Sequence, residues 1–356
     1  MKNLTLKGLL LLIASSFIFI QCTTDPLEGP AGQDGLDGIA GVDGVDGVDG
    51  TTSCTTCHAN SHTDPIYDAY ALSGHATGSS WARGTSASCA QCHNNEGYID
   101  YLSGTFVDED GVQSANPNGY LVSNPITCTG CHNTHRSFDF ENDGNDYALR
   151  NIDPVSLVLD PTTFIDFANE IDPLGLSNAC VTCHQPRPSY AIPAGTEDYE
   201  ITSSRFGPHH GPQSTLVEGI MGANIAGAVG YPGVGSSTHR QGASCTACHM
   251  SEATDASEGG HTWAPSVEVC VTCHSTMTEI PDEISGFTAD FEALHNLLVE
   301  AGSITESGST VSGTYSSKVA QATWNYKTIE EDKSNGIHNP LYTRALLKNS
   351  IEALQN

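Results

Sequence analysis

Residues 245–249 read Cys245-Thr246-Ala247-Cys248-His249, and this short pattern, Cys-x-x-Cys-His, decides the fold because the chain repeats it six times. The copies begin at positions 54, 89, 128, 180, 245 and 270, and they contain twelve of the 13 cysteines. Two thiols three positions apart can form thioethers with both vinyl groups of one haem, and the adjoining histidine then coordinates the iron. The sequence therefore predicts six covalently attached haems c.

Each motif supplies two haem-attaching cysteines and one proximal iron ligand. The predicted thioether cysteines are Cys54, Cys57, Cys89, Cys92, Cys128, Cys131, Cys180, Cys183, Cys245, Cys248, Cys270 and Cys273. The predicted proximal ligands are His58, His93, His132, His184, His249 and His274. A lone Cys-x-x-Cys pair also fits half of a zinc site or a redox dithiol, but neither needs a histidine after every second cysteine. Six complete copies therefore favour haem over zinc or disulfides.

Nine histidines lie outside the motifs, and they decide whether each iron is closed or open. A histidine on both faces saturates the iron, whereas an open face admits a substrate. The predicted distal ligands are His75, His135, His210, His239, His261 and His338, with His209 and His62 as alternatives. His295 falls on an amphipathic segment, where a solvated helix face is the better interpretation. The supply of histidines is sufficient to close all six irons.

The composition argues against an ordinary core and against nucleic acid as a partner. Only 38% of the residues are hydrophobic, so porphyrin faces are expected to supply much of the interior. The chain has 42 acidic and 13 basic residues, a formal charge of −29. Such a charge disfavours nucleic acid and anionic membrane surfaces, and it favours cationic partners or solubility in salt.

The first 21 residues predict export from the cytoplasm. Lys2 and Lys7 precede an apolar run at 9–20, which is signal-peptide architecture and too short for a convincing membrane span. Cys22 follows directly and is the only cysteine outside the motifs, as at a bacterial lipoprotein site. The residues just before it lack the usual small side chains, so cleavage elsewhere is the alternative to lipidation.

Residues 22–52 predict an extended spacer. Glycine recurs at every third position from Gly29 to Gly50, which is the collagen period, and most triplets carry an aspartate. The repeat is short and contains one proline, Pro30, so a self-repelling spacer is favoured over local trimerisation.

The remaining chain divides into a haem-bearing region, 53–280, and a C-terminal helical region, 281–356. In the first region, 64–73 and 163–170 are the better helix candidates. In the second, apolar spacing predicts helices near 288–301, 315–331 and 340–353, with Asn339 as a cap and Pro340 at the first helical position. We interpret these helices as a clamp that delivers His338, with a dimerisation surface as the alternative.

These residues resemble bacterial multihaem cytochromes c, broadly the grouping of cytochrome c nitrite reductase and its octahaem relatives. The resemblance covers about 54–350 and rests on the motifs together with four histidine contexts. The contexts are Ser73-Gly74-His75-Ala76, Cys131-His132-Asn133-Thr134-His135, Gly259-Gly260-His261-Thr262-Trp263 and Gly336-Ile337-His338-Asn339-Pro340. It implies a mainly α fold with extensive loops, wrapped around a stack of closely packed haems. The Cys-x-x-Cys-Lys motif typical of the nitrite reductases is absent, and six haems match neither five nor eight.

The sequence thus predicts an exported hexahaem cytochrome that transfers electrons in the periplasm or at the cell surface, with a lipid anchor to the membrane. Its expected partners are other cytochromes, reductases or an extracellular electron acceptor. One alternative is a reductase of a small nitrogen or sulfur oxyanion with one open haem. Another is a homo-oligomeric subunit of an extracellular cytochrome filament.

Overall fold

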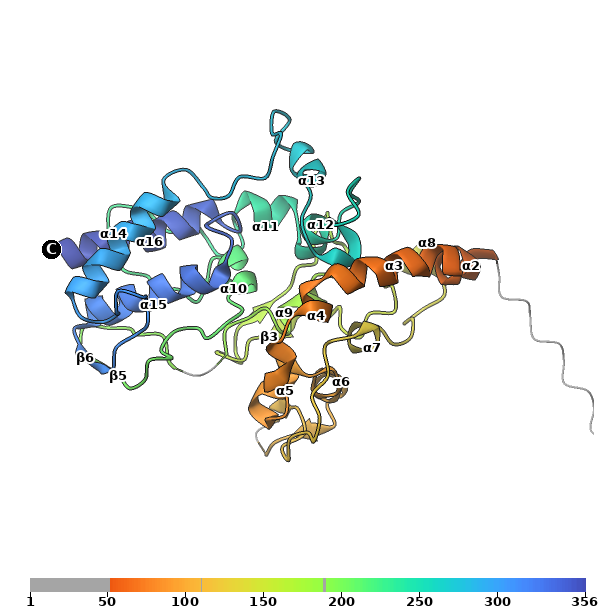
Figure 1. Cartoon of the computed structure of the whole chain (residues 1–356), viewed down its shortest axis with the longest axis horizontal. Helices are drawn as coiled ribbons and strands as arrows, with labels where there is room; N and C mark the ends of the chain where they lie inside the picture. Colours follow the sequence, from red (N-terminus) through yellow and green to blue (C-terminus); the bar gives the residue numbers. More distant parts are fainter. Residues whose placement is uncertain (1–51, 110, 188–189) are drawn as a thin grey trace, which may run out of the picture. The chain divides into compact units, whose positions relative to one another are not determined.

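The computed structural model describes residues 52–109, 111–187 and 190–356 (Figure 1). The predicted signal peptide, the anchor at Cys22 and the glycine repeat therefore lie outside the described residues. The chain divides into two units, Met1–Ser53 and Cys54–Asn356, and the second carries all six motifs.

The motifs lie on or at the ends of short helices. These are α2 (Thr52–His58), α5 (Ala87–His93), α7 (Cys128–Cys131), α9 (Asn178–Val181), α12 (Cys245–His249) and α13 (Val267–Val271). Residues three apart lie on the same face of a helix, so one helical turn suffices to point both thiols of a motif the same way. This need explains why six short helices, rather than a few long ones, carry the motifs.

Within the described ranges, further helices and three small ribbons accompany the motif helices. The helices are α3 (Asn60–Leu72), α4 (Gly74–Thr77), α6 (Asn95–Ser103), α8 (Phe140–Asp143), α10 (Gln213–Glu218) and α11 (Thr238–Gly242), with 3₁₀ turns η1 (Ser80–Arg83) and η2 (Gly260–Thr262). Antiparallel pairs join β1 (Phe106–Val107) to β2 (Gln113–Ser114), β3 (Val155–Ser156) to β4 (Phe164–Ile165), and β5 (Tyr199–Ile201) to β6 (Gly313–Tyr315). The fold is mainly helical with extensive loops.

The helix predicted at 163–170 is wrong, because this segment contains strand β4. Ile165 and Phe167 are fully buried, whereas Phe164 is 61% exposed and Asp166 is exposed. Burial at every second residue is the period of a strand, and Ile165 pairs with Val155 across the ribbon. The other candidate, 64–73, lies almost wholly within α3, which begins four residues earlier and ends one residue earlier.

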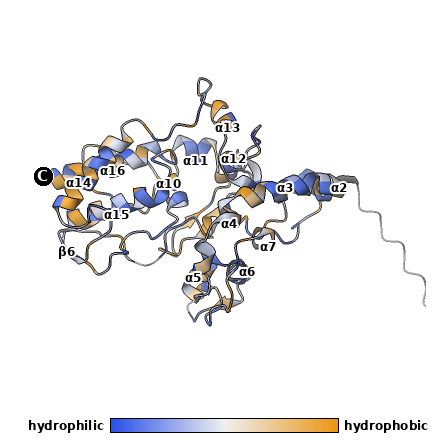
Figure 2. Ribbon diagram, viewed as in Figure 1, coloured by the Kyte–Doolittle hydropathy of each residue, from blue (hydrophilic) through white to orange (hydrophobic). Residues whose placement is uncertain are grey.

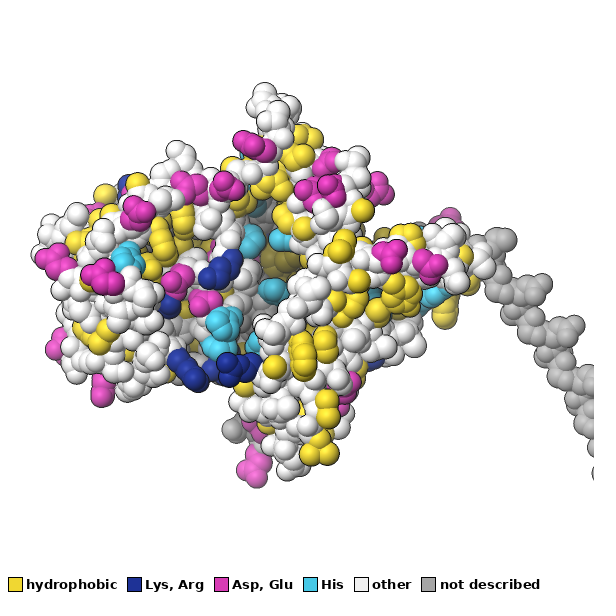
Figure 3. All heavy atoms as spheres, in the orientation of Figure 1, with side chains coloured by type: hydrophobic (Ala, Val, Ile, Leu, Met, Phe, Trp, Pro, Cys, Tyr) yellow, Lys and Arg dark blue, Asp and Glu magenta, His cyan; other side chains and the backbone are white. Residues whose placement is uncertain are grey.

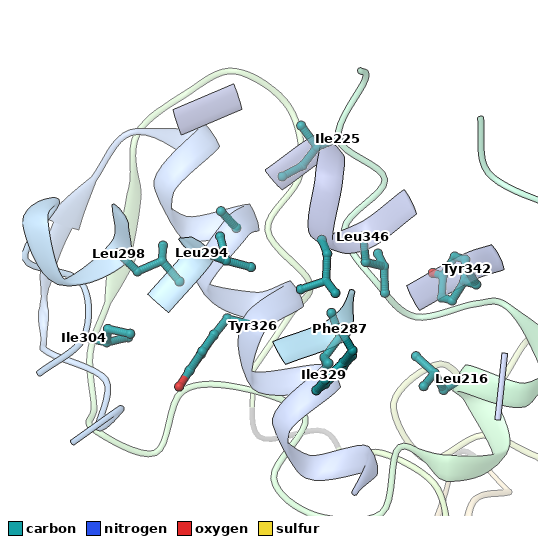
Figure 4. Packing of buried hydrophobic residues seen from close by; sticks show 12 residues of the cluster. Leu216, Ile225, Phe287, Leu294, Leu298, Ile304, Tyr326, Ile329, Tyr342 and Leu346 are labelled. Carbon is teal, nitrogen blue, oxygen red and sulfur yellow. The ribbon is translucent and has the colours of Figure 1, made fainter. Parts of the chain in front are cut away.

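The three C-terminal helices are confirmed as α14 (Phe287–Glu300), α15 (Ser317–Asp332) and α16 (Pro340–Gln355). They pack against one another, and each carries both apolar and polar residues (Figures 1 and 2). Leu294 and Leu298 of α14 meet Tyr326 and Ile329 of α15 and Leu346 of α16 in the largest apolar cluster (Figure 4). This region therefore has the ordinary core that the motif region lacks.

The start of α16 fixes the position of His338. The Asn339 side chain accepts a hydrogen bond from the Tyr342 N–H at 3.1 Å, and Pro340 occupies the first turn, as the sequence predicts. His338 lies directly before this cap, in the loop that joins α15 to α16. Among the described residues, no helix is long and apolar enough to span a membrane.

Leu346→Ala should lower the free energy of unfolding by about 2–5 kcal/mol, because it empties a fully buried position between α16 and its neighbours. Leu341→Ala is the matched control on the same helix, since Leu341 is 58% exposed, and its effect should stay within about 0.5 kcal/mol. Urea unfolding followed by far-ultraviolet circular dichroism measures both. Equal losses would show that α16 is not packed as described.

Candidate haem sites

A single large cavity runs between five of the six motifs. Its volume is about 2890 Å³, several times the ~300–1,000 Å³ of a pocket for one drug-sized ligand. The second to sixth motifs line it, and histidine side chains gather in the hollow visible in Figure 3. The first motif and His135 do not line this cavity. We number the sites 1 to 6 after the order of their motifs in the chain.

Histidine rings face each other in pairs across five sites. Each pair joins one motif histidine to one of the predicted distal histidines, and the ring centroids are 6.2 or 6.3 Å apart in all five. The pairs are His58–His135 at site 1, His132–His261 at site 3, His184–His75 at site 4, His249–His338 at site 5 and His274–His239 at site 6.

This spacing fits one metal atom held between two imidazoles. A bond from imidazole nitrogen to a metal is ~2.0–2.1 Å, and each ring adds roughly 1 Å to its centroid, so two rings on opposite faces of one atom have centroids on the order of 6 Å apart. Direct ring stacking would bring the centroids closer, as in the 4.3 Å contact of His209 with His210. The paired cysteines and the cavity add the remaining requirements of a haem c, so the residues fit this group.

Acidic side chains orient two of the distal histidines. The Nδ1 atom of His135 lies 2.8 Å from Oδ1 of Asp146, and Nδ1 of His338 lies 2.7 Å from Oδ1 of Asp332. Both carboxylates are buried, and both bonds leave Nε2 of the imidazole for the facing site. A carboxylate hydrogen-bonded to Nδ1 fixes the tautomer and the ring orientation of a metal-binding histidine.

Main-chain carbonyls orient three further histidines in the same way. Nδ1 of His239 lies 2.7 Å from the Ile337 oxygen, that of His132 lies 2.7 Å from the Tyr147 oxygen, and that of His249 lies 2.9 Å from the Trp263 oxygen. Since a carbonyl only accepts, each Nδ1 carries the proton. The lone pair of each Nε2 is then available to a metal.

Burial keeps several of these rings neutral. It lowers the pKa of His75 to about 4, helped by the facing His184, and it also lowers the pKa of His249 and His261. A neutral imidazole is the form that binds a metal. At His338, burial acts in the same direction, but the charge and hydrogen bond of Asp332 outweigh it and raise the pKa.

Site 2 differs from the other five. Among the described residues, His93 has no facing ring at the spacing of the other pairs. Burial lowers the pKa of His93, helped by the charge of the nearby His210, and burial also lowers the pKa of His209, with a small contribution from His93. His210 Nδ1 lies 2.8 Å from Oε2 of Glu331, which repeats the carboxylate contact of His135 and His338. His209 has a left-handed backbone, with φ of 70°. The Glu331 contact favours His210 as the ligand at this site.

The other two histidines lie away from these pairs. His62 is exposed on α3, and within the described part of the chain no motif ring faces it. His295 is half-buried on α14, where its ring packs against Tyr326 at 5.8 Å, so its helix face is less solvated than the sequence predicts. Asp146, Glu331 and Asp332 could not be found from the sequence, because they become neighbours of histidines only through the fold.

Short contacts link the sites into two groups, one of sites 2, 4, 5 and 6 and one of sites 1 and 3. Sites 2 and 4 meet where Cys183 Sγ lies 3.6 Å from the Gln91 oxygen, and sites 4 and 5 meet where the Thr246 N–H donates to Ser177 Oγ at 3.1 Å. Sites 1 and 3 share one loop, because His132 belongs to the pair of site 3 and His135 to the pair of site 1. Sites 5 and 6 adjoin through Ile337, the residue before His338.

No family model and no curated protein matches the chain. Among solved structures, the chain is similar to the outer cell wall cytochrome OcwA, with a TM-score of 0.50, 18% identity, and coverage of 82% of this chain and 50% of that one. The fold is multihaem-cytochrome-like. The undecahaem cytochrome from the S-layer of Carboxydothermus ferrireducens matches at a TM-score of 0.37 and 16% identity, covering 87% of this chain and 39% of that one. The chain spans about half the length of the first cytochrome.

His338→Ala should convert one haem from low to high spin, because it removes the ring that faces His249. His295→Ala is the matched control, since His295 packs against Tyr326 and belongs to no pair. Electron paramagnetic resonance of the oxidised protein counts the high-spin haems. An unchanged spectrum for His338→Ala would remove His338 from the ligands.

His210→Ala should likewise produce one high-spin haem at site 2, whereas His209→Ala should leave all haems low-spin. The reason is that only His210 is held by an acceptor on Nδ1 among the contacts of this pair. The same spin count decides between the two. The reverse outcome would assign the ligand to His209 and make the Glu331 contact incidental.

Proposed function

We propose that the chain is a hexahaem c-type cytochrome that carries electrons at the cell surface or in the periplasm, with histidine on both faces of most or all irons. The observation that carries the proposal is the common spacing of 6.2 or 6.3 Å in five histidine pairs, each with one motif histidine. Bound haem iron supplies the one-electron couple, and a second histidine closes the face at which a substrate would bind.

The arrangement of the sites supports transfer rather than storage at isolated centres. Motif contacts join sites 2, 4 and 5 directly, and shared loops join sites 1 to 3 and 5 to 6. The motifs of sites 2 to 6 also line one cavity, and such a continuous set of redox sites is what electron transfer through the protein requires. The likeness in fold to a cytochrome of an outer cell wall supports a place at the cell surface.

Site 1 is suited to exchange with an outside partner. It lies apart from the cavity of the other five sites, and α3, which follows its motif, has no buried residue. Phe138, whose ring lies 5.6 Å from that of His135, is 78% exposed. The net charge of −29 favours a cationic redox protein as that partner over a second copy of this chain. A lipid anchor at Cys22 followed by the spacer at 22–52 would tether the chain to a membrane.

A reductase with one open haem is the second candidate, and site 2 is the reason. His93 lacks a facing ring at the spacing of the other pairs, as described above. Arg187 lines the same cavity beside His93, and its buried Nε has no hydrogen-bond partner among the described residues. A cationic side chain beside an open iron would suit a small oxyanion.

One experiment decides between the two. The purified holoprotein is reduced without oxygen, and its optical spectrum is recorded before and after carbon monoxide is added. If the protein only carries electrons, its mass should correspond to six haems, and carbon monoxide should leave the optical spectrum unchanged because every iron is closed. A response from one haem that is lost together with that haem in the Cys89→Ala, Cys92→Ala double variant would establish the open site and favour the reductase.

A further inference from the structure

Trp263 touches the histidine ligands of three different sites. Its indole packs edge-on against His75 of site 4, with centroids 4.5 Å apart at 80°. The same indole lies 5.4 Å from the ring of His261 of site 3. Its carbonyl accepts the hydrogen bond from Nδ1 of His249 of site 5 at 2.9 Å. Among the described residues, no other side chain has ring contacts with histidines of two of the pairs.

The backbone at Trp263 is unusual for so large a side chain. Its φ is 55°, in the left-handed region that glycine and asparagine enter readily and bulky residues rarely do. A bulky residue in this region is strained, and such residues cluster at functional sites. Glycine would adopt this backbone conformation more easily, so the tryptophan side chain has a role other than forming the turn.

The loop around Trp263 is fixed by bonds that do not involve the indole. Gly259 N–H donates to the Ala264 oxygen at 2.7 Å, and the Thr262 hydroxyl donates to the Gly259 oxygen at 2.6 Å. The Ala264 N–H donates to the Thr262 hydroxyl at 3.1 Å. Because these bonds survive a change of side chain, the indole can be replaced without loss of the loop.

We propose that Trp263 is a positioning residue at the junction of sites 3, 4 and 5, and that it sets the ring orientation of His75 and His261 through its indole and of His249 through its carbonyl. This inference rests on the proposed function, since it requires haems at these three sites. It makes site 4 the branching point of the group, because motif contacts already join this site to sites 2 and 5. The angle between the two imidazole planes on an iron sets the g-values of a low-spin haem, so the role has a spectroscopic signature.

The test compares Trp263→Leu, Trp263→Phe and Trp81→Leu in the full holoprotein by electron paramagnetic resonance. Trp263→Leu should shift the g-values of two haems, at sites 3 and 4, because it removes the ring that packs on His75 and His261. The signal of site 5 should stay, since the main-chain carbonyl that holds His249 remains. The His338→Ala variant identifies that signal, because it removes the facing ligand of site 5.

Trp263→Phe should keep the native spectrum, because it retains an aromatic ring at the same place. Trp81→Leu is the matched control, being the same substitution at a tryptophan that is 38% exposed and, among the described residues, has no ring contact with a paired histidine. A native spectrum for Trp263→Leu, or equal shifts for Trp81→Leu, overturns the inference. A wild-type protein without low-spin haems at sites 3 to 5 overturns the proposed function instead, so the two failures are distinct.

Discussion

The structure depends on one constraint, the distance that two imidazoles must keep if they share a metal atom. Five pairs of rings have this distance, and much of the chain serves to bring these rings together. His184 meets His75 from far earlier in the chain, and His132 meets His261 from far later. Loops with little regular structure suit this task, because only a few residues in each loop have a required position.

The constraint also explains the distribution of apolar side chains. The C-terminal helices α14, α15 and α16 enclose a conventional core, whereas the walls of the large cavity come mostly from short helices and loops. A chain that binds several porphyrins has no need to fill that space with leucine or phenylalanine. The helical region then provides rigid support for the residues that reach the cavity from its edge, including Glu331, Asp332 and His338.

Local features of the fold could be predicted from the sequence, and long-range ones could not. The motifs, the three C-terminal helices and the cap at Asn339 all depend on residues close in sequence. The strand at Phe164–Ile165 was missed because its burial depends on pairing with β3. The distal partner of each motif histidine could not be predicted either, because spacing along the chain does not encode which distant ring faces it. Glu331 and Asp332 could not be singled out, because the chain has 42 acidic residues and nothing in the sequence distinguishes these two.

The groups that accept the hydrogen bond from Nδ1 of the distal histidines differ in charge, and this difference affects the reduction potentials of the sites. Carboxylates stand behind His135, His210 and His338, whereas a neutral carbonyl stands behind His239. A carboxylate makes the imidazole a stronger electron donor and stabilises the oxidised iron, so it lowers the reduction potential. Sites 1, 2 and 5 would then hold electrons less tightly than site 6. The reduction potentials of these sites would then be set in part by residues that touch no haem iron.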